Sequence, residues 1–498
     1  MCNRRCEDAC TRGRVDAAVA IDEVKKFIAQ RDLDAATRYV PPVVTPTRAG
    51  GFDQKIAIIG AGPAGLSCAF YLAEKGYKPV VFEKNERPGG MLTYGIPSFK
   101  LQKDVIEAEV EIIRLMGAEF RYGVEVGRDV TLDELRAQGF KAFYVAIGCQ
   151  GGRLAGIPGE DAEDVTVAVD FLREVNSGKI DTLSGRTIVV GGGNVAIDVA
   201  RNACRLGSEH VEMFCLESEA QMPASEEERR EAVEDGAHIS CGWGPKEIHL
   251  DEAGHVCGIT FKRCTRVFDD EGRFAPEYDE NDLRRVDADR VVMSIGQSIM
   301  WGDLLAGSKV ELGRGQGALA DPQTYQTAEP DIFVGGDVYT GPSFAIDAIA
   351  AGHEAAVSIH RFVQPGSTLT IGRNQRRYTA LDRDDVVLEG YDNASREVAH
   401  VDREREKAAP FSEYVETFTE EQVRAETARC LGCGASIVDP NKCIGCGVCT
   451  TKCEFDAIHL HRDLPECSTM VRSEDKFKAI LPYMAKREVK IRFGKKDK

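Results

Sequence analysis

The stretch Lys55–Gly65, with the sequence KIAIIGAGPAG, decides how the first part of this 498-residue chain is organised. The apolar run Ile56–Ile59 has the length and β-branching of a strand that is buried on both faces. It is followed by the turn Gly60-Ala61-Gly62 and by a helical pattern over Ala64–Glu74. A strand, a glycine turn and a helix form the context in which GxGxxG predicts a dinucleotide-binding turn.

The residues of this turn suit a bound pyrophosphate. Gly60 allows the tight turn, Gly62 lets the backbone approach the phosphates, and Gly65 lets the helix pack closely on the strand. The N-terminus of the helix presents free N–H groups to the phosphates. A second strand, Lys78–Phe82, runs into Glu83, whose carboxylate can accept a hydrogen bond from a ribose hydroxyl.

A second turn of this kind lies about 130 residues further on. A predicted strand, Thr187–Val190, is followed by the sequence GGGNVA over Gly191–Ala196 and by a predicted helix over Ile197–Leu206. Alanine at the third glycine position is an allowed variant of the fingerprint. The next predicted strand, His210–Phe214, leads to Glu217. Two dinucleotide sites in one chain indicate that electrons pass between the bound cofactors.

A late glycine–acid pair follows the strand pattern DIFVGGD over Asp331–Asp337, before a predicted helix over Phe344–Phe362. Asp337 either binds a ribityl hydroxyl at the mouth of the first dinucleotide site or simply caps a helix.

Many of the 17 cysteines cluster near the two ends of the chain. The spacing C-x2-C-x2-C-x3-C over Cys443, Cys446, Cys449 and Cys453 is that of bacterial ferredoxins and favours a 4Fe–4S cluster over zinc. Cys430 and Cys433 precede it and, with Cys453, would begin a second cluster, so we expect one or two. The cysteines of the N-terminal segment are one thiolate short of a closed site and are either cluster ligands or structural thiols: Cys2, Cys6 and Cys10.

The composition excludes several functional classes. A formal net charge of −18 argues against a nucleic-acid partner, which requires a basic face. No apolar run approaches the roughly 20 residues needed to span a bilayer. The first ten residues lack the apolar centre of a signal peptide, so we expect a cytoplasmic protein. The order of the patterns predicts an α/β protein with two Rossmann-like dinucleotide-binding domains, a small helical Cys-rich N-terminal segment and a ferredoxin-like α+β C-terminal domain.

Taken together, the motifs resemble the small (β) subunit of glutamate synthase and related modules of dihydropyrimidine dehydrogenase and electron-bifurcating transhydrogenases. The resemblance rests on the N-terminal cysteines, GAGPAG, the Gly89-Gly90-Met91-Leu92 turn with YGIP, GGGNVAIDVAR and the late GGD, and covers about residues 1–365. The C-terminal cysteines resemble the ferredoxin-like extension of longer members. The resemblance implies FAD bound by Gly60, Gly62, Pro63, Ala64, Gly65, Glu83, Lys84, Gly90, Met91, Leu92, Gly336 and Asp337. It implies a nicotinamide cofactor bound by Gly191, Gly193, Asn194, Val195, Ala196 and Glu217.

The resemblance also implies a domain plan in which the nicotinamide domain is inserted into the flavin domain. We expect a partial helical Fe–S segment at 1–50, an FAD-binding domain at 51–166 and 301–365, an NAD(P)-binding domain at 167–300, a connector at 366–412, and a ferredoxin-like domain with a tail at 413–498.

Two positions depart from the family pattern. Members that use NADPH carry two arginines after the second strand of the nicotinamide domain, where this chain has Leu216 and Glu217. A carboxylate there accepts from a 2′-hydroxyl and repels a 2′-phosphate, which predicts a preference for NAD(H). Family members also carry further cysteines upstream of the position of Cys2. The N-terminal clusters are therefore either completed by a partner chain or reduced to one or none.

The sequence thus predicts an NAD(P)H-dependent flavoprotein that moves electrons between a nicotinamide and a redox protein partner through FAD and 4Fe–4S clusters, as a subunit of a hetero-oligomer. The alternatives are a flavin-based bifurcating subunit of a transhydrogenase, hydrogenase or formate dehydrogenase complex, and a non-catalytic Fe–S scaffold. A disulfide reductase is disfavoured because Gly89–Pro97 contains no cysteine. We expect no catalytic proton donor, since positioning suffices.

Overall fold

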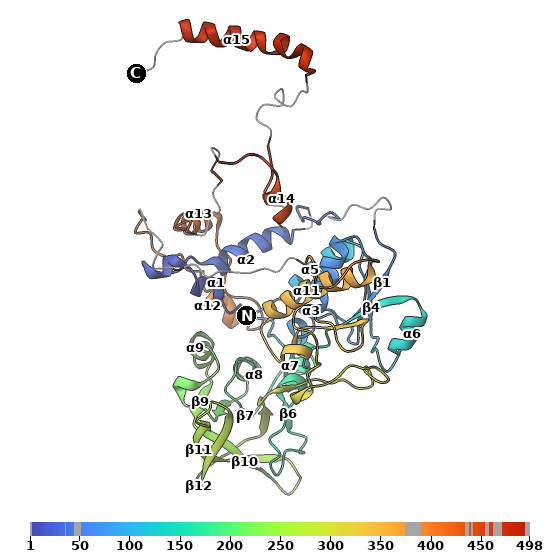
Figure 1. The fold of residues 1–498 in the computed structure, drawn as a ribbon. Helices are drawn as coiled ribbons and strands as arrows, with labels where there is room; N and C mark the ends of the chain where they lie inside the picture. Colours follow the sequence, from blue (N-terminus) through green and yellow to red (C-terminus); the bar gives the residue numbers. More distant parts are fainter. Residues whose placement is uncertain are drawn as a thin grey trace. The chain divides into compact units, whose positions relative to one another are not determined.

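The computed structural model describes residues 2–34, 36–43, 51–373, 382, 390–433, 438–439, 442–453, 458–461 and 471–493. The chain divides into two compact units, Met1–Leu431 and Gly432–Lys498. The first unit contains two five-stranded parallel sheets, one around each glycine turn (Figure 1).

The first sheet has the strand order β15-β4-β1-β2-β3, with every neighbouring pair parallel. Its strands are β1 (Lys55–Ile59), β2 (Val80–Glu83), β3 (Glu119–Tyr122), β4 (Phe140–Val145) and β15 (Ile332–Val334). Its helices are α3 (Pro63–Glu74), α4 (Met91–Tyr94), α5 (Lys103–Leu115), α6 (Leu132–Ala137), α10 (Asp337–Thr340) and α11 (Ala345–Val363).

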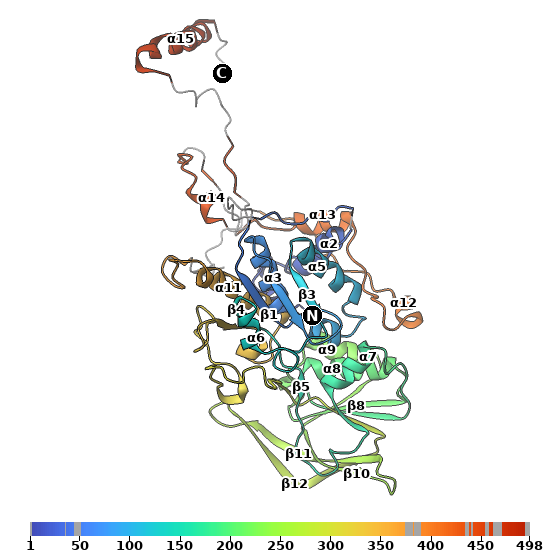
Figure 2. The same cartoon turned by 90° about the vertical axis from the view of Figure 1, so that its right-hand side faces the viewer.

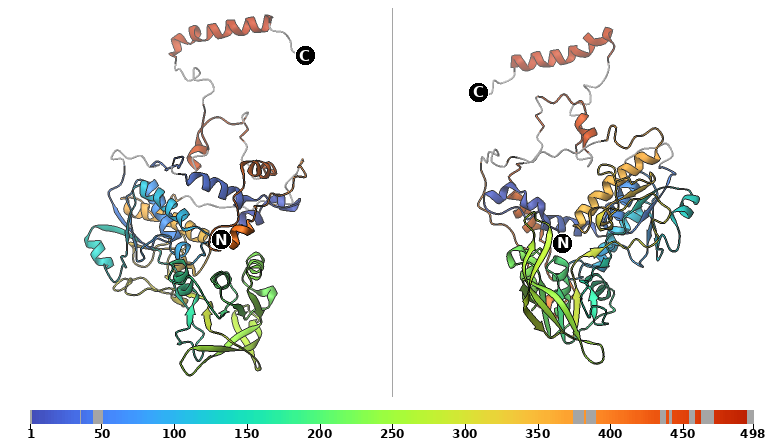
Figure 3. Two further views of the ribbon diagram at one scale, coloured as in Figure 1. Left: turned by 180° about the vertical axis from the view of Figure 1, so that it is seen from behind. Right: turned by 60° about the horizontal axis from the view of Figure 1, so that its bottom comes forward.

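The strand β1 is buried on both faces, as its unbroken apolar run predicts. Ile56 and Ile58 pack in one core with α3 and α11, which lie side by side (Figure 3, blue and orange). Ala57 and Ile59 pack in a second core with α6 on the opposite face. The predicted helices over 64–74 and 344–362 are confirmed to within one residue.

The second sheet has the order β6-β13-β7-β8-β9 and is also parallel throughout. Its strands are β6 (Val165–Val167), β7 (Arg186–Val190), β8 (His210–Cys215), β9 (His238–Cys241) and β13 (Arg290–Met293). Its helices are α7 (Ala168–Asn176), α8 (Asn194–Arg205) and α9 (Glu226–Glu234). The helix α8 begins three residues before the predicted start at Ile197, because Gly193 is its N-cap and 194–196 form its first turn.

Smaller elements complete this region. The strands β10 (Trp243–Leu250), β11 (Val256–Phe268) and β12 (Phe274–Val286) form an antiparallel sheet, seen at the bottom of Figure 2. A short antiparallel pair joins β5 (Gly151–Gly152) to β14 (Gln297–Ser298). The single-turn 3₁₀ helices are η2 (Glu219–Gln221) and η3 (Arg314–Gln316).

The N-terminal segment packs against residues 390–431. It contains α1 (Arg5–Asp8), η1 (Thr11–Arg14) and α2 (Ile21–Asp32), and the later residues contain α12 (Arg403–Ala408) and α13 (Glu420–Ala428). The apolar pattern of the sequence predicts a helix over Val15–Gln30, and this prediction is wrong in its first part, since α2 begins at Ile21. The carbonyls of Ala17 and Ala18 instead accept hydrogen bonds from Arg429 and Arg396, which lie 412 and 378 residues away in the sequence. These bonds attach residues 17–18 to the segment 390–431.

In the second unit the described elements are α14 (Val448–Lys452), η5 (Ser473–Asp475) and α15 (Lys476–Phe493). The sequence predicts a helical tail after residue 465, and α15 confirms it. The sequence also predicts a short strand over Phe455–Leu460 beside the C-terminal cysteines, and a further cysteine, Cys467, follows it. The strand lies largely, and Cys467 entirely, outside the described residues. Within the described ranges, no helix combines the length and apolarity that crossing a membrane requires.

Candidate dinucleotide and iron–sulfur sites

The first glycine turn joins β1 to α3 in a conformation that requires glycine. Gly60 has φ +105°, and a Cβ added there would lie 2.5 Å from the carbonyl oxygen of Ala146. A Cβ on Gly65 would lie 1.9 Å from the oxygen of Gly60. Gly62 is the N-cap of α3 and Pro63 its first residue, so the free N–H groups of Ala64 and Gly65 open toward the turn.

Glu83 fixes this turn from the end of β2. The side chain is 3% exposed, and its Oε2 accepts from the Ala61 N–H at 2.8 Å. Its Oε1 accepts from the N–H of Asn85 at 2.9 Å and from its amide group. A carboxylate has about four lone-pair positions, so one remains for a ribose hydroxyl. The sequence did not indicate the part of Asn85, and the neighbouring Lys84 is exposed.

The loop before α4 comes within van der Waals contact of the turn. A Cβ on Gly90, which has φ +53°, would lie 2.9 Å from the Cα of Gly62. Met91 and Leu92 follow as the first residues of α4. Lys103, which the sequence did not single out, donates to the carbonyl of Leu92 at 2.9 Å, and burial lowers its pKa to about 8. The structure therefore brings together three groups of residues that the sequence predicts to bind FAD: residues 60–65, Glu83 and residues 90–92.

The late glycine–acid pair joins the same site. A Cβ on Gly336 would lie 3.0 Å from the Cβ of Ala64. Asp337 begins α10, and its Oδ1 accepts from the Ser343 N–H at 3.3 Å. Burial raises the pKa of Asp337 to about 6. Glycines without room for a side chain, helix N–H groups and buried acids together fit the pyrophosphate and sugar of an FAD molecule.

The second glycine turn repeats this construction between β7 and α8. Gly191 has φ +143°, and a Cβ there would lie 2.3 Å from the carbonyl oxygen of Ser294. No atom lies within 4 Å of a Cβ placed on Gly193, the N-cap of α8, so that position is open. The side-chain oxygen of Asn194 accepts from the Ser225 N–H at 3.2 Å. Ala196 is fully buried in the first turn of α8, and Val195 is partly buried.

Glu217 stands at the second turn much as Glu83 stands at the first. A Cβ on Gly192 would lie 2.9 Å from Glu217 Oε2, and the Glu217 carbonyl accepts from the Gly242 N–H at 2.9 Å. Arg263 lies nearby: a Cβ on Gly242 would be 3.2 Å from its guanidinium carbon, which stacks 5.2 Å above the ring of Trp243. The turn, its helix and this carboxylate fit the adenosine half of a nicotinamide dinucleotide.

Two thiols lie beneath this second turn. Cys215 and Cys241 are register partners on β8 and β9, and their sulfur atoms are 3.7 Å apart. Burial, with the neighbouring Cys241, raises the pKa of Cys215. This pair is at the nicotinamide turn rather than beside the first glycine turn, where a disulfide reductase needs its redox cysteines.

The predicted cluster ligands are distributed over both units. Cys2, Cys6 and Cys430 are exposed and Cys10 is partly exposed in the first unit. In the second unit the exposed thiols are those of Cys433, Cys443, Cys446 and Cys449, and Cys453 is partly exposed. Among the described residues no three metal-ligating side chains converge on one point. The four-cysteine spacing over 443–453 is therefore the feature that fits a 4Fe–4S cluster.

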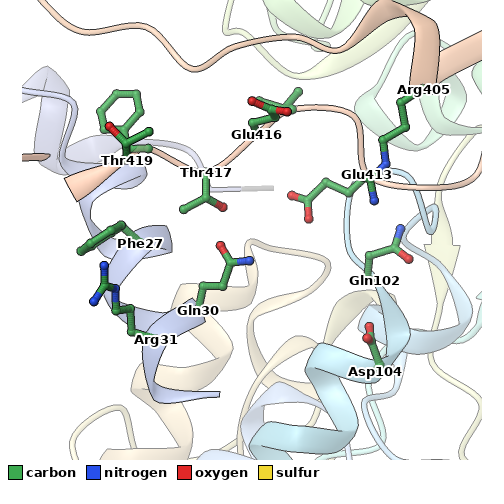
Figure 4. Close-up of a pocket in the computed structure, with 12 residues that line it drawn as sticks. Phe27, Gln30, Arg31, Gln102, Asp104, Arg405, Glu413, Glu416, Thr417 and Thr419 are labelled. Carbon is green, nitrogen blue, oxygen red and sulfur yellow. The ribbon is translucent and has the colours of Figure 1, made fainter. Parts of the chain in front are cut away.

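A cavity of about 630 Å³ in the first unit contains none of the predicted site residues (Figure 4). It lies between α2, which contributes Phe27 and Gln30, the start of α5 at Asp104, and the extended stretch 413–419. The cavity belongs to the packing of 390–431 on the N-terminal segment and the start of α5, and no residue of either glycine turn lines it.

Residues 54–352 match the pyridine nucleotide-disulphide oxidoreductase family, a stretch that contains both glycine turns and the late glycine–acid pair. The chain belongs to the pyridine nucleotide-disulphide oxidoreductases. Residues 436–459 match the 4Fe-4S binding domain. These matches confirm the predicted α/β oxidoreductase class and support FAD and 4Fe–4S clusters as cofactors.

Relatives within this family confirm the resemblance to the glutamate synthase small subunit. The glutamate synthase [NADPH] small chain of Escherichia coli K12 is 34% identical over 381 residues, covering 73% of this chain and 79% of that protein. The NADP(+)-dependent formate dehydrogenase subunit beta of Moorella thermoacetica is 34% identical over 469 residues, covering 87% of this chain but 64% of that protein. FprA of Mycobacterium tuberculosis in complex with NADPH shares the fold, with a TM-score of 0.54 at 19% identity, over 62% of this chain and 84% of FprA.

Proposed function

We propose that this chain is an electron-transfer subunit that takes electrons from NADH at the second glycine turn, passes them through FAD at the first, and delivers them through 4Fe–4S clusters to a redox protein partner. One observation carries the proposal: one compact unit contains two strand–glycine–helix turns of the same construction. Each has a glutamate close by, Glu83 at the end of β2 and Glu217 two residues after the end of β8. When bound, FAD exchanges electrons in pairs with a nicotinamide and singly with iron–sulfur clusters. The residues of the chain bind and orient the two cofactors.

Contacts between the two regions fix one turn relative to the other. The Asn176 side chain on α7 donates to the carbonyl of Tyr94, at the end of α4, at 3.2 Å. Lys100, a few residues later, pairs with Asp198 on α8 at 2.6 Å and also with Glu228 on α9. Since α4 follows Gly90 and α8 follows Gly193, these contacts hold the two dinucleotide turns in a fixed arrangement, which electron transfer between bound cofactors requires.

Glu217 supports the preference for NADH over NADPH. Its carboxylate lies at the glycine turn, where it accepts from a ribose 2′-hydroxyl and repels a 2′-phosphate. Arg263 is the competing feature, because its guanidinium lies near Gly242, whose N–H contacts the Glu217 backbone. A 2′-phosphate bound by Arg263 would reverse the preference.

An anaerobic titration tests the electron path. NADH, and separately NADPH, is added to the full chain loaded with FAD and iron–sulfur clusters, while flavin absorbance and low-temperature EPR are followed. We expect NADH to bleach the flavin and to produce a reduced-cluster signal. Flavin reduction with every cluster still oxidised would contradict transfer within this chain. The absence of any response in loaded protein would favour a scaffold.

Two variants test the nicotinamide preference. The double change Leu216→Arg and Glu217→Arg should raise the NADPH-to-NADH ratio of kcat/KM by about tenfold or more, because a repelling charge becomes two attracting ones (about 1.4 kcal/mol per tenfold). Arg263→Leu is the control and should leave the ratio unchanged. A wild-type preference for NADPH that Arg263→Leu abolishes would refute the reading of Glu217.

The partner is proposed from the relatives. The formate dehydrogenase relative is a subunit beta, and this chain spans about two thirds of its length. We therefore propose that the chain acts within a hetero-oligomer. Purification of a stably tagged chain as a fully active monomer, with no co-purifying redox protein, would contradict this.

A further inference from the structure

A buried ion network ties the N-terminal cysteine segment to the residues just before Cys430. Its central side chains are almost completely buried: Arg12 and Arg429 are each 1% exposed and Glu426 is 0% exposed. In Figure 1 the helix α13, which carries Glu426, lies next to α2, and the two helices are in contact. Buried charges of this kind are found only where they are paired and hydrogen-bonded, so the arrangement is specific.

Each arginine of the network donates to a backbone carbonyl of the other segment. Arg12, two residues after Cys10, donates from Nη1 to the carbonyl of Arg429 at 3.1 Å, and Cys430 follows that carbonyl directly. Arg429 donates in turn to the carbonyl of Ala17 at 2.7 Å and pairs with Asp16 at 2.9 Å.

Glu426 and Arg396 extend the same attachment. Glu426 Oε1 accepts from the Ala20 N–H at 2.8 Å and pairs with Arg429 at 2.6 Å. Arg396 pairs with the buried Glu7, which lies between Cys6 and Cys10, at 2.7 Å. The chain on both sides of Cys10 and the chain leading to Cys430 are therefore held together by buried contacts.

Two independent observations separate Cys430 from the ferredoxin-type cysteines. The match to the 4Fe-4S binding domain begins at residue 436, after Cys430. The boundary between the two compact units also falls after Leu431, which leaves Cys430 in the first unit. The remaining motif still has four thiols of its own: Cys443, Cys446, Cys449 and Cys453.

We propose that Cys430 ligates the same 4Fe–4S cluster as Cys10, with Cys2 and Cys6 supplying the other two thiolates, and does not serve the cysteines of 443–453. Four cysteine thiolates are the usual ligand set of such a cluster, and the N-terminal segment alone offers three. The four thiols are exposed or partly exposed, which leaves them able to turn toward a common cluster. This inference goes beyond the proposed electron path and does not depend on which nicotinamide binds.

Iron content and EPR of reconstituted full-length protein test the assignment. The variants are Cys10→Ala, Cys430→Ala, the double variant, and Cys449→Ala as the matched control for the C-terminal cluster. We expect Cys10→Ala and Cys430→Ala to abolish or alter the same EPR signal, with loss of up to about four iron atoms per chain. The double variant should lose no more than either single variant. Cys449→Ala should affect a different signal and spare this one.

Three outcomes would overturn the proposal. Cys430→Ala could remove the EPR signal that Cys449→Ala removes, or it could leave every signal and the iron content unchanged. In the third outcome, the iron lost in the double variant would be the sum of the iron lost in Cys10→Ala and in Cys430→Ala. The FAD-to-protein ratio and the melting temperature of each variant serve as the folding control. Because the readout is iron and EPR in dithionite-reduced protein, a failure of the NADH titration would not affect it.

Discussion

Replacing Gly65 by alanine should destabilise the chain even without FAD. The added Cβ would lie 1.9 Å from the oxygen of Gly60 and 3.1 Å from its carbonyl carbon, both backbone atoms of a turn that cannot easily move. Overpacking of this kind costs about 1–3 kcal/mol. At roughly 2–4 °C per kcal/mol for a domain of this size, the melting temperature of the apoprotein should fall by about 2–12 °C.

Gly62→Ala is the matched control for this prediction. Its φ of −78° suits alanine, and the nearest atom to its Cβ is the Cα of Gly90 at 4.0 Å. Alanine lowers the conformational entropy of the unfolded chain, which stabilises the fold, but it is a poorer N-cap than glycine, which destabilises it. The two effects roughly cancel, so the free energy of unfolding of the apoprotein should stay within about 1 kcal/mol of wild type. The methyl group would nevertheless occupy the space that a pyrophosphate approaches, so FAD binding should weaken. Thermal unfolding of the two apoproteins measures their stability, and FAD titration measures cofactor affinity. Equal melting temperatures for Gly65→Ala and Gly62→Ala would refute the packing argument.

Three further predictions concern buried charges. Because burial raises the pKa of Asp337 to about 6, the apoprotein should lose stability as the pH rises from about 4 to 6, and Asp337→Asn should remove that loss and be more stable at pH 7 in denaturant titrations. Lys100→Met leaves Asp198 and Glu228 without their cation and should cost about 3–5 kcal/mol of unfolding free energy at pH 8. The cost should become smaller as the pH is lowered, because burial raises the pKa of Asp198 and a protonated Asp198 needs no cation. Glu83→Gln removes an acceptor from the first glycine turn and should cost about 1–3 kcal/mol and weaken FAD binding; unchanged FAD affinity would contradict its role.

The parts of the fold that depend on local sequence could be predicted. The strands and helices around Gly60 and Gly191 follow from apolar runs, glycine turns and helical periodicity, all within about 20 residues. The predicted start of α8 lies three residues too late because the sequence does not distinguish turn residues from the first turn of a helix. The strand–turn–helix spacing also predicts Glu83 at the first turn. Glu217 at the second turn comes instead from the family resemblance, which places it where NADPH-using members carry an arginine.

Long-range contacts could not be predicted from the sequence. The close approach of Gly336 to Ala64 depends on the direct pairing of β15 with β4, two strands that are separated in the sequence by the whole second sheet. The hydrogen bond from Arg12 to Arg429 joins residues 417 positions apart, and neither arginine has a sequence pattern that marks it as buried. The predicted N-terminal helix starts too early for the same reason. The carbonyls of Ala17 and Ala18 accept tertiary hydrogen bonds from Arg429 and Arg396, and the Ala20 N–H donates to Glu426, in place of helical hydrogen bonds.

The pairing of β15 with β4 has a consequence for synthesis on the ribosome. Residues 146–331 must be translated between the two strands, which takes roughly 10–40 s at about 5–20 residues per second. During that interval β4 presents an unpaired sheet edge, and such edges template aggregation. The second sheet, whose strands are all contained within 165–293, can complete itself first. Vectorial synthesis therefore favours a nascent chain in which the inserted region is native before the region that surrounds it.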